Sequence, residues 1–150
     1  MTITPSNLAA FVADTRIAIY EEEQRLNAAD ARIGDGDTGS MLRRVIDAMA
    51  KVDTARAASL ADAAMALAQA AMKETGSSLG TLIATAAMAF AKAAKAADNE
   101  ISANNIGRVV SEMRDSVAAR GKALPGDKTV IDSLDAIAVA LNTDAAANRS

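Results

Sequence analysis

A chain of 150 residues has the length of one domain, and we expect residues 1–150 to form a single domain. Alanine makes up about a quarter of the residues, whereas aromatic residues make up only 2%. Because alanine favours helices and few residues here favour strands, this composition predicts an all-α protein and argues against a β-sandwich or a β-barrel.

Net charge and missing residue types exclude several functional classes. The chain has no Cys, which excludes disulfide scaffolds and fits a reducing compartment, and no His, which excludes Ser–His and Cys–His catalysis. A net charge of −3 with scattered basic residues argues against nucleic-acid binding. The start of the chain lacks signal-peptide features, and no apolar run approaches the roughly 18 residues that span a bilayer. We therefore expect a cytoplasmic protein that binds neither nucleic acid nor membranes.

Apolar spacing and capping residues predict six helices, three of them in the N-terminal half. The first begins at Thr4–Pro5, where Thr is a candidate N-cap and Pro suits the first helical position. The second follows the glycine-rich stretch 34–39, and the third begins at Ser59, with Asp62 at the capping-box position usually held by Glu. The residues expected to face inward from the first helix are Leu8, Phe11, Val12, Ile19 and Leu26.

The other three helices complete an antiparallel up-and-down bundle, because short connections join neighbouring helices. The fourth carries an apolar stripe from Leu79 to Phe90. Ser102 is the expected N-cap of the fifth, and Gly121 its left-handed C-terminal residue. The sixth is expected to begin near Asp127, and the polar tail 142–150 to fray. Its inward residues are expected to be Val130, Leu134, Ile137 and Leu141.

The segment 30–41 combines carboxylates, glycines and the start of a helix. Its three carboxylates belong to Asp30, Asp35 and Asp37. Carboxylate oxygens are the ligands that Mg²⁺ and Ca²⁺ prefer, and a helix N-terminus favours anions, so the segment suggests a site for a metal and a phosphate.

Two known loop types do not fit this segment. An EF-hand loop counted from Asp35 has Ile46 where Glu is required, and a Walker A loop needs Lys–Ser/Thr where Ser40–Met41 follow Gly39. From spacing alone, an acidic turn with good helix caps and no ligand remains the alternative.

Two further loops follow odd-numbered helices. Residues 75–78 connect helices three and four, and residues 121–130 connect helices five and six. Either loop could serve only as a set of helix caps. In an up-and-down bundle, however, loops after odd-numbered helices share one end with the acidic segment, which favours a single shared site.

The segments Ile33–Gly39, Gly76–Ser78 and Gly121–Thr129 resemble, in order and spacing, those of the dihydroxyacetone kinase L subunit. The resemblance extends from about residue 8 to residue 141. It implies an antiparallel helical barrel whose loops at one end bind ADP or ATP with two Mg²⁺ ions. Members of that family continue for about two more helices, so the resemblance implies a shortened six-helix barrel that is open along one flank.

The same resemblance implies roles for individual residues. The expected metal ligands are Asp30, Asp35 and Asp37. The expected phosphate contacts are Thr38, Gly39, Ser40 and Met41. The expected lining of the nucleotide is Ser77, Ser78, Gly121 and Val130. No residue of this chain is expected to act as a catalytic acid, base or nucleophile.

The resemblance also implies partners. A K-type subunit would hold the hydroxy-ketone through a His, in agreement with the absence of His here, and phosphoryl transfer would cross the subunit interface. The donor would be ATP, or an ADP that a phosphocarrier protein rephosphorylates, and we expect a homo-oligomer. Two alternatives are a shortened, non-catalytic paralogue that acts as a regulatory or protein-binding module, and a purely structural bundle.

Overall fold

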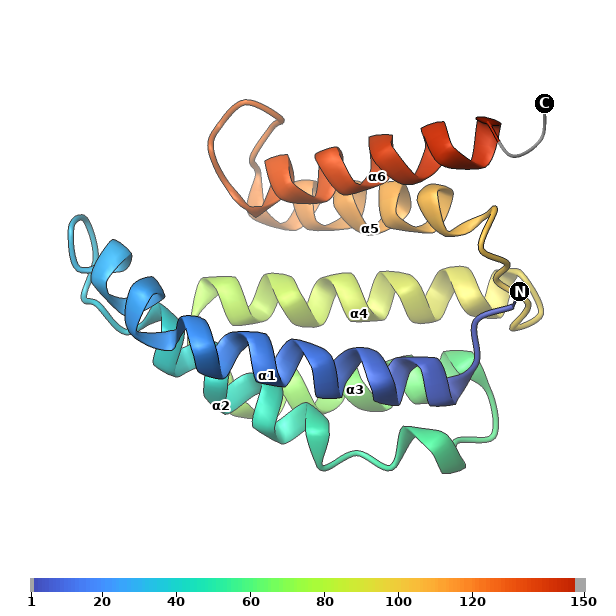
Figure 1. The fold of residues 1–150 in the computed structure, drawn as a ribbon, viewed down its shortest axis with the longest axis horizontal. Helices are drawn as coiled ribbons and strands as arrows, with labels where there is room; N and C mark the ends of the chain where they lie inside the picture. The colour runs from blue at the N-terminus through green and yellow to red at the C-terminus, as the bar shows by residue number, and fades with distance from the viewer. Residues whose placement is uncertain (1, 148–150) are drawn as a thin grey trace.

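The computed structural model describes residues 2–147, and in that part of the chain six α-helices and one short 3₁₀ helix follow one another in antiparallel order (Figure 1). The predicted all-α bundle is therefore confirmed. The elements are α1 (Pro5–Asp30), α2 (Thr38–Ala50), η1 (Thr54–Arg56), α3 (Leu60–Glu74), α4 (Ser78–Ala96), α5 (Ile106–Gly121) and α6 (Val130–Ala147).

Side-chain caps fix the starts of α1 and α3 where the sequence predicts them. The Thr4 hydroxyl accepts the N–H of Asn7, whose side chain accepts the Thr4 N–H in return, and Pro5 follows as the first helical residue. The Ser59 hydroxyl accepts the N–H of Asp62 at 3.0 Å. Each cap satisfies N–H groups that have no partner inside the helix.

The predicted boundaries of α5 and α6 are wrong by a few residues. Asn105, not Ser102, precedes α5, because Ser102 forms a β-bridge with Thr2 that ties the N-terminus to the α4–α5 connection. The left-handed residue after α5 is Lys122, with φ 54°, rather than Gly121. The sixth helix begins at Val130 instead of Asp127.

The predicted fraying of the tail is wrong for residues 142–147, which continue α6 as helix. Residues 148–150, the remainder of that predicted tail, lie outside the described part of the chain.

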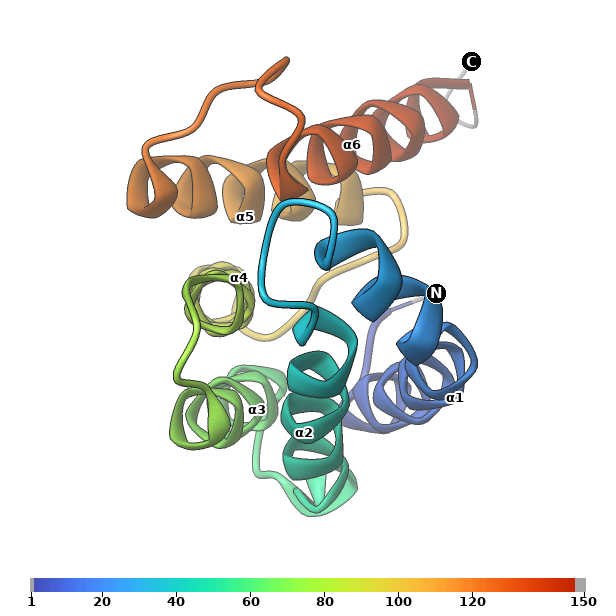
Figure 2. The same cartoon turned by 90° about the vertical axis from the view of Figure 1, so that its left-hand side faces the viewer.

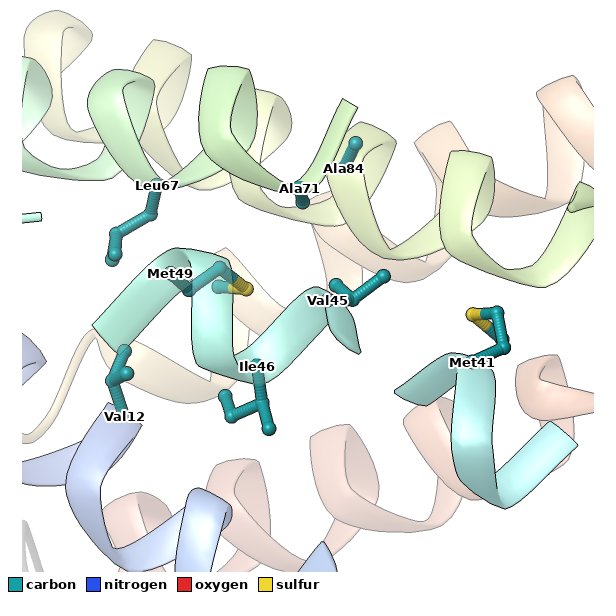
Figure 3. Packing of buried hydrophobic residues seen from close by; sticks show 8 residues of the cluster. All are labelled: Val12, Met41, Val45, Ile46, Met49, Leu67, Ala71 and Ala84. Carbon is teal, nitrogen blue, oxygen red and sulfur yellow. The ribbon is translucent and has the colours of Figure 1, made fainter. Parts of the chain in front are cut away.

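Two clusters of buried side chains form the core. The first joins α1, α2, α3 and α4, and includes Val12, Val45 and Leu67 (Figure 3). The second joins α3, α4 and α5 around Leu60 and Phe90. Because alanines occupy many core positions of α3 and α4, these two helices pack closely along their length. Burying each large apolar side chain stabilises the bundle by about 1.5–3 kcal/mol.

The helices pack in chain order and leave the bundle open between its first and last members. Within residues 2–147, α6 packs on α5 alone and does not contact α1. Two residues predicted to face inward therefore face outward: the side chains of Phe11 on α1 and Ile137 on α6 are 65% and 49% exposed. Both predictions were wrong because no described helix covers these two side chains.

The central helix α4 is long and apolar enough, by length and composition, to span a membrane. The expectation that no segment meets this criterion therefore fails for α4. The helix packs against both α3 and α5, and core helices of bundles meet the same criterion.

Candidate functional site

The three loops that follow α1, α3 and α5 lie at the same end of the bundle, as the sequence predicts. They are at the left in Figure 1 and face the viewer in Figure 2. Residues 31–37 connect α1 to α2, residues 75–77 connect α3 to α4, and residues 122–129 connect α5 to α6. Among the described residues, no hydrogen bond joins one of these loops to another.

The carboxylates of Asp30, Asp35 and Asp37 converge in the α1–α2 loop. One oxygen from each lies within 4.8 Å of the others. Asp30 is half-buried at the end of α1, whereas Asp35 and Asp37 are exposed. Three carboxylate oxygens this close together repel one another unless a cation lies between them, and such a set fits Mg²⁺ or another hard divalent ion. The three carboxylates predicted from the sequence are therefore together, and their binding of a metal stays a prediction.

Asp30 organises the loop that carries the other two carboxylates. Its Oδ2 accepts the N–H groups of Gly36 at 2.9 Å and Asp37 at 3.0 Å. Gly36 has a φ of +79°, which favours glycine. A Cβ at Gly34 would lie 2.4 Å from Asp30 Oδ1, so a side chain there would displace the carboxylate. The loop therefore turns around Asp30.

Partial burial tends to raise the pKa of Asp30, but the backbone N–H groups of Asp37, Gly36 and Thr38 outweigh it. The pKa therefore lies below its usual range. The carboxylate is consequently ionised at neutral pH, as a metal ligand must be.

The first turn of α2 rests directly against α1. A Cβ on Gly39 would lie 2.2 Å from the Glu23 carbonyl oxygen, so the two helices approach within a distance that only glycine allows. The N–H of Ser40 donates to Asn27 Oδ1 at 3.1 Å, and the N–H of Met41 donates to the Asp37 carbonyl at 2.8 Å. The Met41 side chain is buried in the core.

Two N–H groups of that turn remain. The one of Thr38 is turned toward the Asp30 carboxylate, and the one of Gly39 has no acceptor among residues 2–147. The predicted phosphate contacts are thus together at one helix N-terminus, and Gly39 is the one among them whose N–H has no acceptor in the described part of the chain.

A stripe of polar side chains on α1 faces α2 and was not identified from the sequence. The stripe comprises Arg16, Tyr20, Glu23, Asn27 and Asp30. Their spacing of four, three, four and three residues places them on one face of a helix, and this periodicity is the signal that could have found them. Their partners on α2 are Ser40, Arg43 and Asp47, which share the same spacing.

Glu23 and Arg43 are at the centre of this polar interface. Glu23 Oε1 accepts the Ser40 hydroxyl at 3.1 Å, and Oε2 pairs with Arg43 at 2.8 Å. The Glu23 side chain is only 14% exposed, and Arg43 and then Ser40 hold its pKa below the usual range despite this burial. Glu23 ends the acidic run Glu21–Glu23, a pattern typical of a solvated helix face, but its own side chain is paired and largely buried.

Arg43 also lies over the ring of Tyr20, 4.2 Å from its centroid, and the Tyr20 hydroxyl donates to Asp47 at 2.8 Å. Arg16 bonds the same carboxylate at 2.6 Å. The interface between α1 and α2 is thus a continuous network that runs toward the acidic loop.

Ser77 and Ser78 lie at the start of α4. Ser77 is the N-cap: its hydroxyl accepts the N–H of Gly80 at 3.1 Å, and its own N–H donates to Thr75. Ser78 is exposed at the first helical position. The cap explains Ser77 without a ligand, and a nucleotide contact for either serine stays a prediction.

Gly121 and Val130 flank a loop that a carboxylate holds in shape. Asp132 accepts the N–H of Gly126 at 2.6 Å and of Thr129 at 2.8 Å, and these two bonds lower its pKa. A Cβ on Gly121 would make ordinary contacts with Leu82 at 3.5 Å and longer. The role of Gly121 and Val130 in lining a nucleotide also stays a prediction.

Comparison with known proteins identifies relatives of this chain. The DAK2 domain family matches residues 32–150. The ADP-binding subunit DhaL of the PEP-dependent dihydroxyacetone kinase 1 of Listeria innocua is 30% identical over 128 residues, which cover 84% of this chain and 63% of that protein. The ADP-binding subunit DhaL of the PTS-dependent dihydroxyacetone kinase of Lactococcus lactis is 28% identical over 129 residues, or 85% and 64%. The chain spans a little under two thirds of the length of these curated relatives.

Proposed function

Because the chain belongs to the DAK2 domain family, we propose that it is the nucleotide- and Mg²⁺-binding subunit of a dihydroxyacetone-type kinase. The observation that carries the proposal is the convergence of Asp30, Asp35 and Asp37 directly before the N-terminus of α2. The two relatives named above are ADP-binding subunits, which supports ADP as the nucleotide.

In this proposal the three carboxylates hold two Mg²⁺ ions, and the first turn of α2 receives the phosphates. When bound, the ions neutralise charge on the phosphoryl group that is transferred. The N–H groups of Thr38 and Gly39 contribute to positioning, since a helix N-terminus attracts anions. Ser77, Ser78, Gly121 and Val130 would line the rest of the nucleotide from the other two loops.

This division of labour needs no acid or base from this chain. This chain binds the nucleotide and the metal ions and orients the phosphoryl group. A K-type partner subunit holds the hydroxy-ketone. For the two relatives, the printed names describe PEP- and PTS-dependent kinases, so a phosphocarrier protein that rephosphorylates bound ADP is the donor we favour over free ATP.

The test is thermal unfolding with and without ADP and Mg²⁺. At about 100 times the dissociation constant, a ligand stabilises the folded state by about 2.7 kcal/mol, which raises Tm by several degrees for a domain of this size. The increase should require both ADP and Mg²⁺ and should disappear in Asp35→Ala. Asp14→Ala, which changes an exposed carboxylate on α1 away from all three loops, is the matched control and should keep the increase. No increase in the unmodified protein would refute the proposal.

A second function, as a protein-binding module, is favoured by one observation. Apolar side chains on α1 and α6 are exposed, including Ile17 at 60% and Val139 at 57%. Such a module requires no metal, so stability that is independent of Mg²⁺ and ADP would favour this function.

A further inference from the structure

Two side chains of α1 outside the metal cluster, Asn27 and Glu23, hydrogen-bond the first turn of α2, which follows the acidic loop 31–37. Asn27 bonds both polar groups of Ser40: its Oδ1 accepts the N–H at 3.1 Å, and its Nδ2 donates to the hydroxyl at 3.0 Å. The same hydroxyl donates to Glu23. A side-chain amide and a carboxylate on adjacent turns of α1 thus fix one residue of α2 in both position and rotamer.

These contacts decide which N–H groups remain for an anion. Ser40 would ordinarily offer the third free N–H of the helix, but Asn27 already accepts it. The Met41 N–H makes the first ordinary bond inside the helix, to the Asp37 carbonyl. Of the two that remain, the Thr38 N–H is turned toward the Asp30 carboxylate, and the Gly39 N–H has no acceptor among residues 2–147. A phosphate bound at this helix end would therefore meet the first two residues of α2 and not the third.

The close approach at Gly39 makes this arrangement rigid. Its Cα lies so near α1 that a Cβ would be 2.2 Å from the Glu23 carbonyl and 2.9 Å from Asn27 Oδ1. Glu23 is itself anchored through Arg43. A shift of the first turn of α2 would break all of these contacts together, so the turn has little freedom to follow a ligand.

We propose that Asn27 and Glu23 are positioning residues, which hold the first turn of α2 so that the N–H group of Gly39 is left for the nucleotide phosphate beside the Thr38 N–H that bonds Asp30. This inference rests on the proposed nucleotide site and adds to it the residues that set its phosphate-binding geometry. Neither residue touches the nucleotide in this account. Both act through Ser40 and Gly39, as supporting residues around a binding site do.

The test compares Asn27→Ala with Gln24→Ala, a neighbouring exposed residue of α1 that makes no side-chain hydrogen bond among the described residues. Calorimetry gives the Kd of ADP in Mg²⁺, and electron paramagnetic resonance gives the Kd of Mn²⁺ without nucleotide. Asn27→Ala should weaken ADP binding about 10-fold to 100-fold while Mn²⁺ binding stays within about 2-fold. Gln24→Ala should change neither.

Ser40→Ala provides a second variant, because it removes the hydroxyl but keeps the N–H that Asn27 accepts. It should weaken ADP binding less than Asn27→Ala. Amide hydrogen exchange without ligand gives an independent measurement: the Ser40 N–H should be protected in the unmodified protein and in Ser40→Ala, and should exchange faster in Asn27→Ala.

The outcomes separate the two proposals. If the unmodified protein binds no ADP, the proposed function fails and this inference fails with it. If it binds ADP and Asn27→Ala matches Gln24→Ala, only the positioning role is refuted. Equal losses of ADP and Mn²⁺ affinity in Asn27→Ala would also refute it, because they would show a general disruption of the loop.

Discussion

In both the α1–α2 loop and the α5–α6 loop, one carboxylate accepts two backbone N–H groups of the loop. The two loops differ in whether further carboxylates lie beside it. Asp30 accepts the N–H groups of Gly36 and Asp37, and Asp132 accepts those of Gly126 and Thr129. Around Asp30, two more carboxylates converge. Within residues 2–147, no comparable cluster surrounds Asp132. A carboxylate that folds a glycine-containing loop is thus a structural element, and the additional carboxylates point to a cation.

The helices that follow the two loops, α2 and α6, differ in how firmly they are packed. A polar network and a glycine contact hold α2 against α1, whereas α6, within residues 2–147, packs on α5 alone and has exposed apolar side chains. The first loop therefore has a rigid base. The following predictions test this difference, from the largest expected effect to the smallest.

Replacing a glycine by alanine should lower the free energy of unfolding at the α1–α2 contact and raise it at the end of α5. In Gly39→Ala the new Cβ meets the backbone of α1 at 2.2 Å, so the helices must separate, and we expect a loss of about 1–3 kcal/mol in the free energy of unfolding. In Gly121→Ala the Cβ only contacts Leu82 at 3.5 Å and longer, so replacing a helical glycine should add about 0.4–1 kcal/mol. Urea unfolding measures both, and equal effects would contradict the account.

Neutralising the organising carboxylate should weaken metal binding when it is done in the α1–α2 loop but not when it is done in the α5–α6 loop. Asp30→Asn deletes a charged ligand, and we expect Mn²⁺ affinity to fall at least about 10-fold. Asp132→Asn disturbs the other loop to a similar degree and should leave the affinity within about 2-fold. Titration followed by electron paramagnetic resonance measures both variants, and a similar loss in the two would place the ion elsewhere.

Both organising carboxylates should make stability depend on pH. Their pKa values are lowered in the folded state, so each contributes stability above the pKa of the unfolded chain and loses it as the pH falls through the folded value. The Tm should therefore fall as the pH is lowered from about 5 toward 3. The decrease should be shallower in Asp30→Asn and in Asp132→Asn. Asp14→Asn, at an exposed position on α1, is the control and should follow the unmodified protein.

On α6, the effect of truncating an apolar side chain should depend on which side of the helix it lies. Ile137→Ala removes a half-exposed side chain and should change stability by no more than about 0.5 kcal/mol. Ile131 is 1% exposed, and Ile131→Ala should cost at least about 2 kcal/mol. A loss at Ile137 as large as at Ile131 would mean that the open flank is covered in solution, and the sedimentation coefficient would then show whether a second copy covers it.

The sequence predicts local features well because short-range chemistry determines them. The caps at Thr4 and Ser59 need only residues three positions apart. The loops that follow α1, α3 and α5 share one end of the bundle because of helix order alone. The carboxylates of Asp30, Asp35 and Asp37 lie within eight residues of sequence, so their proximity in space is expected. The boundaries of α5 and α6 were harder to predict, because they depend on contacts outside the local sequence. Ser102 forms a β-bridge with Thr2, and Asp132, a residue of α6, binds the loop that precedes the helix.

The contacts between helices could not be predicted in the same way. Glu23 appears as the end of an acidic run, and only the partner helix shows that it is paired with Arg43. The outward direction of Phe11 and Ile137 depends on which helices cover the flank, which their own spacing does not determine. The stripe from Arg16 to Asp30 is a readable pattern, but its meaning comes from the matching residues on α2.

The most direct test of the account replaces Mg²⁺ by Mn²⁺ and follows the amide resonances of the whole chain. Mn²⁺ broadens the signals of nearby nuclei. The account predicts that low concentrations broaden residues 34–39 selectively, that ADP strengthens this effect and extends it to residues 77–78 and 121–130, and that Asp35→Ala removes it. Uniform broadening, or selective broadening at a different part of the bundle, would contradict a metal and nucleotide site in the α1–α2 loop.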